Sequence, residues 1–213
     1  MTPIVNSVNH KVSIALSGLL LVALLTLGAV CWTTFSTRSA ANALLLEIRA
    51  LRVGEATFSD AEKLSTIYAS YRTSGSEPCS SKECNFSFGF DNRWLHRLGL
   101  APYTVLTYQL YVTDGRVAWI ELMMATDPIA KAVVEESLAG RDVSPYDVNG
   151  KLVTLGSVSH AILIDVKFTP QANPSQKERS LAFNLSCLTS IGGCKYSEEM
   201  LPQIRLDAKP ANR

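Results

Sequence analysis

The longest apolar segment of the chain runs from Val12 to Phe35 and contains no charged residue. As an α-helix it would measure about 36 Å at ~1.5 Å per residue, enough to cross a bilayer core of ~30 Å. Lys11 precedes it, while Trp32 and Arg38 stand at its far end, where an aromatic ring and a cation suit the headgroup layer. The pattern predicts a transmembrane helix over 12–35, preceded by a short tail over 1–11.

A cleaved signal peptide is the alternative interpretation of this segment. Signal peptides usually have an apolar region of ~7–15 residues, closely followed by a cleavage site between small residues. The nearest small-residue site, Ser39 to Ala41, lies beyond Arg38 and past the end of the apolar run. We therefore expect an uncleaved span.

Helical spacing continues after the span. Leu44, Ile48 and Leu51 recur on one face with charged residues between them, which predicts a stalk helix over 36–56 that ends near Gly54. A second helix is predicted next, because a serine and a glutamate three residues later have the spacing of a capping box. These two residues are Ser59 and Glu62.

The clearest strand signal is a hairpin. Residues 103–113 and 116–125 flank Asp114-Gly115, a dipeptide that suits a type I′ turn. Pairing outward from this turn sets Val112 opposite Val117, Leu110 opposite Trp119 and Tyr108 opposite Glu121. This register predicts that Trp119 lies in the core, and that Glu121 accepts a hydrogen bond from Tyr108.

Other segments complete the predicted fold. Residues 86–90 alternate aromatic and small side chains like a half-buried strand, and the apolar run 160–168 reads as a central strand. Residues 128–139 favour a helix, with a strand as the alternative because of adjacent β-branched valines. A capping-box pattern predicts a helix over 175–191, and the tail 207–213 is predicted to be disordered.

These elements predict an α+β fold, in which an antiparallel sheet is covered by helices within one globular domain over 57–206. The chain of 213 residues carries 20 Lys and Arg against 19 Asp and Glu. It has no basic tract, so we expect no nucleic-acid partner.

Four cysteines form two tight clusters, Cys79 with Cys84 and Cys187 with Cys194. Neither spacing is the C-x2-C of common zinc modules, so we expect no metal site, and we expect no cofactor. Disulfides fit better, although spacing alone leaves local and crossed pairings open. We expect Cys187 to bond Cys194, because Gly192-Gly193 permits the chain reversal that a disulfide requires.

Two signals disagree about the compartment of the domain. Arg38, Arg49 and Arg52 follow the span whereas Lys11 alone precedes it, which favours a cytoplasmic domain. Disulfides require an oxidising compartment, whereas free buried thiols would fit the cytosol. We give the cysteines more weight and expect an extracytoplasmic domain.

One polar cluster is a candidate for chemistry. It contains Asp91, Arg93, His96 and Arg97, and Glu121 is a further carboxylate on the hairpin. The cluster could bind an anionic ligand, with His96 as acid or base. If Asp91, His96 and Glu121 converge in one pocket, an enzyme is favoured; if they are dispersed, a binding module is favoured.

The structural interpretation of the same residues is plainer. Trp94, Leu95 and Leu98 would dock on the core while the neighbouring arginines face water. His160 begins an apolar strand and fits a core or edge position. We therefore assign no catalytic residue.

Two blocks, FGFDNRWLHRLGLAP and FNLSCLTSIGGC, resemble recurring blocks of an uncharacterised family of bacterial single-pass membrane-anchored proteins. The resemblance covers most of residues 44–201. It implies a bacterial envelope protein in the inner membrane and supplies no activity.

These observations favour a non-enzymatic envelope module that binds a partner or maintains the cell surface. The expected partners are the lipid bilayer and another envelope protein. An envelope hydrolase that uses the region from Asp91 to His96 is the alternative. A pilin-like subunit ranks lowest, because residues 1–11 lack the pilin processing site and the glutamate that follows it.

Overall fold

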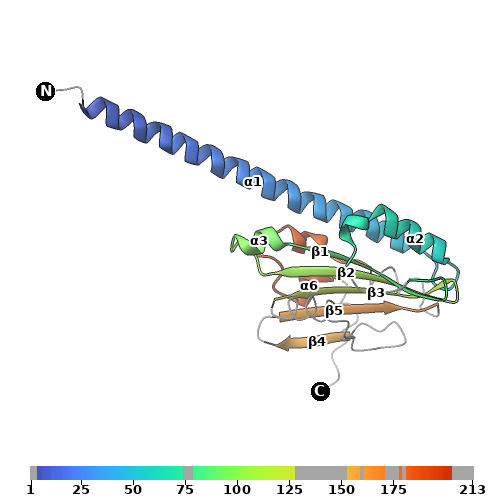
Figure 1. Ribbon diagram of the computed structural model, residues 1–213. Helices are drawn as coiled ribbons and strands as arrows, with labels where there is room; N and C mark the ends of the chain where they lie inside the picture. The colour runs from blue at the N-terminus through green and yellow to red at the C-terminus, as the bar shows by residue number, and fades with distance from the viewer. Residues whose placement is uncertain are drawn as a thin grey trace, which may run out of the picture.

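The computed structural model describes residues 4–73, 79–127, 153–158, 161–170, 178 and 181–202. A long helix leads into a sheet domain, and its first half projects from that domain (Figure 1). The predictions for residues 128–139, for His160 and for the tail 207–213 lie outside the described residues.

Helix α1 (Ile4–Ala50) combines the predicted span and the helical segment after it. It begins inside the predicted tail and ends before Gly54. Its part from Leu16 onward contains an 18-residue window with a mean hydropathy of 2.1 and is long and apolar enough to cross a membrane. Leu44 and Ile48 are fully buried, so the second half of α1 is a core element of the domain.

In the described part of the chain, the sheet has five antiparallel strands in the order β1-β2-β3-β5-β4. They are β1 (Glu83–Asp91), β2 (Thr104–Thr113), β3 (Arg116–Thr126), β4 (Val153–Val158) and β5 (Ala161–Phe168). The structure confirms the hairpin, the predicted strand at 86–90, and the predicted strand at 160–168 from Ala161 onward. β5 is an internal strand, as predicted. The fold is α+β.

The hairpin turns as predicted, but its register is wrong beyond the first pairs. Asp114 and Gly115 have φ values of 52° and 77°, the positive angles that a type I′ turn needs. A bulge at Ala118 of β3, opposite Tyr111 and Val112, then shifts the pairing, so that Trp119 lies opposite Tyr111 and Leu110 lies opposite Ile120. Ile120 is therefore the buried residue, and Trp119 is only half-buried on the other face.

Helix α2 (Phe58–Ile67) covers the same sheet face as α1, and it begins two residues earlier than predicted. Thr57 is its N-cap: the Thr57 backbone N–H donates to the Asp60 carboxylate at 2.8 Å, and the Thr57 hydroxyl accepts from the Asp60 backbone. This start places the Phe58 ring 5.7 Å from the ring of Phe86 on β1. The packing therefore selects Thr57 over Ser59.

The predicted helix over 175–191 does not run continuously: Glu178 is helical, but the described residues 181–191 contain no α-helix. Residues 181–184 are irregular, and a short 3₁₀ helix, η2 (Leu185–Leu188), follows. The Asn184 side chain accepts from the Ser186 backbone at 3.1 Å and donates to the Glu199 carbonyl at 2.9 Å. These bonds tie the segment to α6 (Ser197–Met200) and replace a continuing helix. Two further short helices among the described residues are η1 (Ala69–Tyr71) and α3 (Arg93–Arg97).

Candidate functional site

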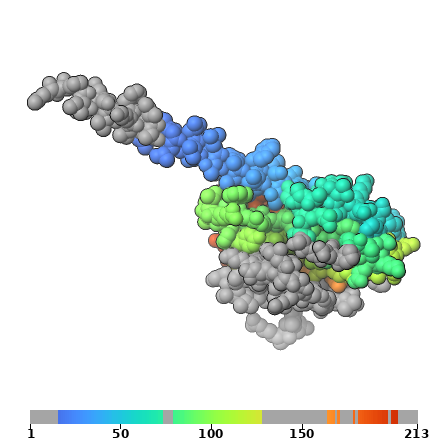
Figure 2. All heavy atoms as spheres, viewed as in Figure 1, coloured from blue at the N-terminus to red at the C-terminus, as the bar shows by residue number. Residues whose placement is uncertain are grey.

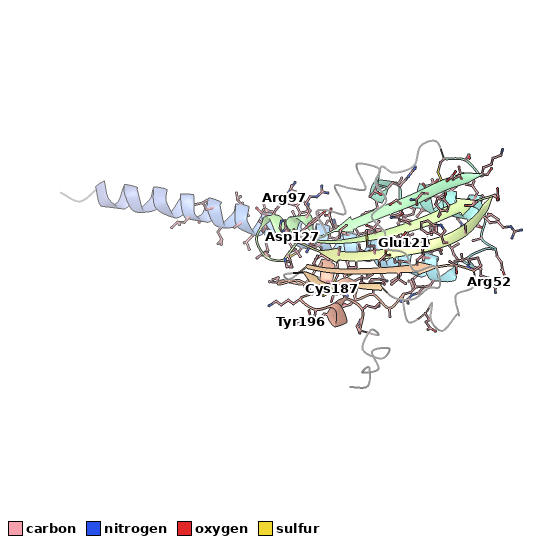
Figure 3. All side chains as sticks on the ribbon, turned by 90° about the horizontal axis from the view of Figure 1, so that it is seen from below. Arg52, Arg97, Glu121, Asp127, Cys187 and Tyr196 are labelled. Atoms are coloured by element: carbon pink, nitrogen blue, oxygen red, sulfur yellow. A yellow bond between two sulfur atoms is a disulfide. The ribbon has the colours of Figure 1, made fainter. Side chains whose placement is uncertain are left out.

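The predicted polar cluster lies at the corner where the projecting half of α1 leaves the domain. We call this the exit corner; it contains the end of β1, α3 and the loop from α3 to β2. Figure 3 shows Arg97 and Asp127 at this end of the domain and Arg52 at the opposite end. In the space-filling view, the blue residues of α1 meet the green residues around α3 (Figure 2).

Asn92 holds the exit corner together. Its side chain is fully buried, and its amide nitrogen donates to the Pro102 carbonyl at 2.8 Å. Its side-chain oxygen accepts from the Thr104 backbone N–H at 2.7 Å. Because buried polar groups need partners, these bonds fix the path of the chain between β1 and β2.

Asp91 is the centre of an ion-pair and hydrogen-bond network. The Arg93 guanidinium donates to one Asp91 carboxylate oxygen at 2.9 Å, and the Tyr103 hydroxyl donates to the same oxygen at 3.1 Å. Burial, followed by the charge of Asp91, raises the pKa of Tyr103 to about 12. The same carboxylate raises the pKa of Arg93. Asp91 therefore positions its neighbours.

The other two predicted members of the cluster make aromatic contacts. The His96 ring lies 5.6 Å from the Tyr103 ring, and the Arg97 guanidinium carbon lies 5.2 Å from the centre of the Trp94 ring. The second contact is a cation–π interaction. Among the residues that the structure describes, no three His, Cys, Asp or Glu side chains gather to hold a metal ion.

Glu121 does not join the exit corner. It is buried on β3 opposite Gln109 of β2 and Lys167 of β5, whereas Asp91 lies opposite Val105. The offset along β2 is about 14 Å at ~3.4 Å per residue, and β2 itself separates the two carboxylates. Figure 3 shows Glu121 well away from Arg97.

The predicted hydrogen bond between Tyr108 and Glu121 is also wrong. Tyr108 lies opposite Leu122, and its hydroxyl donates to the Ala41 carbonyl of α1 at 3.2 Å. The bulge in the hairpin causes this change, because the extra residue in β3 places Leu122 opposite Tyr108 and moves Glu121 to the position opposite Gln109. Tyr108 consequently joins the sheet to α1.

A groove of about 420 Å³ separates α1 from the exit corner. On one side it is lined by Trp32 and hydroxyl side chains of α1, and on the other by Asp91, Arg93 and Trp94. The sequence pattern does not predict this groove, because the groove exists only where α1 packs beside β1. Its aromatic and hydroxyl lining suits a ligand or surface with both apolar and polar parts.

The apolar side chains of α3 divide differently from the prediction. Leu95 is buried as expected, but Trp94 and Leu98 are each 49% exposed. Leu95 packs with Val30 of α1 and Ala101. Because this five-residue helix is too short to bury more than one side, Trp94 and Leu98 face outward.

The four cysteines outside α1 form the two local pairs. The Cα atoms of Cys79 and Cys84 lie 4.6 Å apart, and those of Cys187 and Cys194 lie 5.1 Å apart. Both distances fit disulfides. The Gly192-Gly193 pair reverses the chain with φ values of 83° and 62°, as predicted.

Comparisons of the chain with protein-family models, curated proteins and solved structures found no significant match. The family suggested by the two sequence blocks therefore stays a prediction.

Proposed function

We propose that the protein is a single-pass protein of the bacterial inner membrane whose extracytoplasmic domain is a non-enzymatic envelope module that binds a partner. The separation of Glu121 from Asp91 supports a binding module over a hydrolase. One Asp91 oxygen accepts from the Arg93 and Tyr103 side chains and the other accepts from the Arg93 backbone N–H, so both oxygens are engaged in holding the exit corner. The predicted hydrolase would need Asp91, His96 and Glu121 to converge in one pocket.

The membrane and the compartment are supported by α1 and the cysteines. The projecting half of α1 exposes many leucine side chains, which form an apolar surface suited to contact with lipid. The pairs Cys79–Cys84 and Cys187–Cys194 fit an oxidising compartment. On this basis the span is uncleaved and the domain lies outside the cytoplasm.

Anchoring is tested by washing membranes with alkaline carbonate. The full-length chain is expected to stay in the membrane pellet, because an uncleaved span resists extraction. A shortened chain that begins near Asn42 and is released into the supernatant would contradict the anchor and indicate signal cleavage.

The compartment is tested by thiol labelling of intact bacterial cells with a reagent that does not cross the inner membrane. A Cys31→Ser variant removes the free cysteine of α1. We expect labelling of the four remaining cysteines in intact cells only after reduction. Labelling without reductant, and only once the cells are broken, would place the domain in the cytoplasm.

A pilin-like subunit becomes a second candidate because α1 is built into the domain. Ala41, Leu44 and Ile48 are fully buried, and Tyr108 bonds to the backbone of α1. The projecting half therefore extends rigidly from the domain and could pack against the same segment of other copies. Mechanical shearing separates the two proposals: a filament subunit appears in the sheared material, whereas an anchored module stays with the cells.

A further inference from the structure

The apolar segment of α1 and the domain overlap along the chain. Val30 lies inside the uncharged run that extends to Phe35, yet it is only 7% exposed. It is buried by Leu95 of α3 and by Ala101 of the following loop. The domain therefore contacts α1 before the apolar run ends.

The part of the run that precedes Val30 is close to the length needed to cross a bilayer. From Val12 to Ala29 the helix measures about 27 Å at ~1.5 Å per residue, close to the ~30 Å of the hydrocarbon core. If this part is the span, Val30 lies at the membrane surface. The exit corner then begins there too, with no spacer between lipid and domain. Figure 1 shows α3 as the domain element beside the projecting helix.

Exposed apolar side chains gather at this same end of the domain. We call them the proximal rim; they are Trp32, Phe35, Trp94, Leu98 and Ile191, exposed by between 49% and 77%. They come from α1, from α3 and its C-terminal end, and from the disulfide loop. The Gly192 backbone N–H donates to the Leu100 carbonyl at 2.7 Å, which fixes the disulfide loop beside the end of α3.

Cations accompany the proximal rim. Arg97 lies over the Trp94 ring, and Arg38 donates to the Thr189 hydroxyl at 3.4 Å. Of the carboxylates at this end, Asp91 forms an ion pair with Arg93, and Asp127 is the first residue after β3. Aromatic rings beside arginines are the side chains that favour the headgroup layer, where the ring is half in lipid and the cation meets phosphate.

We propose that the proximal rim rests in the interfacial layer of the bilayer, so that the domain itself makes a second membrane contact beside the span. The occupant of this surface is the lipid bilayer, because the rim is continuous with the projecting apolar helix. This proposal rests on the proposed anchoring. It adds that the domain is held at a fixed orientation on the membrane, which fixes the direction in which the far end of the sheet faces a partner.

The test uses quenching of tryptophan emission by brominated lipid. The chain has three tryptophans: Trp32 and Trp94 in the rim, and Trp119 near the hairpin turn at the opposite end of the sheet. Full-length variants are reconstituted in phosphatidylcholine vesicles whose acyl chains are brominated near the glycerol, with unbrominated vesicles as the reference. Trp32→Phe reports on Trp94, Trp94→Phe reports on Trp32, and the double variant leaves Trp119 alone. Both changes affect exposed side chains, so the fold is retained.

We expect quenching in both single variants and none in the double variant. If Trp94→Phe is quenched but Trp32→Phe matches the double variant, the anchor stands and the surface contact is overturned. If neither single variant is quenched, the anchor is overturned as well. Shielding of Trp94 from aqueous acrylamide in native membranes, without quenching in brominated vesicles, would overturn the lipid contact in favour of a protein partner.

Discussion

At the scale of single residues, the exit corner depends on a few polar side chains that bond to one another. Asn92 joins β1 to the start of β2 with two buried hydrogen bonds, and Asp91 collects Arg93 and Tyr103 around one oxygen. Such networks hold a surface in shape. The proximal rim needs this rigidity, because a mobile α3 would not present Trp94 at a constant depth.

The Tyr103 phenol predicts how this corner responds to pH. Its pKa is raised to about 12 from the ordinary 10.0, mainly by burial and next by Asp91. A raised pKa in the folded state means that the contribution to stability is complete below pH ~10. That contribution is lost as the pH rises toward the folded value. We expect spectrophotometric titration of the wild type, after subtraction of Tyr103→Phe, to show one phenol ionising near pH 12.

The Asp91→Asn variant is the matched control for this titration. It should lower the pKa of Tyr103 only partly, because burial remains when the charge is removed. Ionisation of Tyr103 near pH 10 in the wild type would show that the phenol is exposed, and the described network would then be incorrect.

At the scale of elements, the bulge in β3 decides which side chains form the core. Ile120 is fully buried, whereas Trp119 stacks on Tyr111 with ring centres 4.8 Å apart and lies under Lys167. We expect Ile120→Ala to lower the free energy of unfolding by about 2–5 kcal/mol, as loss of a buried branched side chain does. Trp119→Ala should cost about 1–2 kcal/mol, because it loses one aromatic pair at a half-buried position. Urea denaturation of the solubilised chain measures both losses. A larger loss for Trp119→Ala than for Ile120→Ala would show that the hairpin has no bulge and that Trp119 lies in the core.

The start of α2 offers a second comparison within one element. Thr57→Ala removes the hydroxyl that accepts from the Asp60 backbone, and we expect a loss of about 1 kcal/mol. Ser59→Ala is the matched control and should change stability by less than about 0.5 kcal/mol, because Ser59 is an exposed residue inside the helix. The same denaturation measurement applies, and equal effects of the two changes would argue against Thr57 as the cap.

At the scale of the whole molecule, the disulfide loop joins α6, η2 and the exit corner. We expect a double Cys187→Ser and Cys194→Ser variant to lose about 2–3 kcal/mol, because the unfolded chain regains the freedom of a short closed loop. The Cys31→Ser variant should be as stable as the wild type, because Cys31 is a free cysteine on the projecting helix. Denaturation midpoints with and without reductant measure this, and a wild type that is indifferent to reductant would show that the pair is not bonded.

In the whole molecule, the predicted span and the domain are joined by a single helix. Val30 and Ile48 belong to one continuous helix, yet they are buried by different parts of the domain. Helical periodicity identified the apolar face around Ile48. It did not identify what covers that face, because a stalk partner and a domain core bury the same residues.

The sequence by itself determined the features that depend on neighbouring residues. Asp114-Gly115 fixed the turn because few residues other than glycine and asparagine or aspartate accept positive φ, and alternation around Phe88 fixed β1. The Gly192-Gly193 reversal indicated the local cysteine pair in the same way. Each of these signals acts through the backbone preferences of adjacent positions.

Only the tertiary structure decided the features that depend on distant residues. The bulge beside Tyr111, the choice of Thr57 as the cap and the non-helical course of residues 181–184 all follow from what the sheet must bury. A capping box or an apolar repeat is compatible with several registers, and packing against β1 and α1 selects one of them. The exit corner is likewise a tertiary product, because Val30, Leu95 and Ala101 meet only when α1 lies along the sheet.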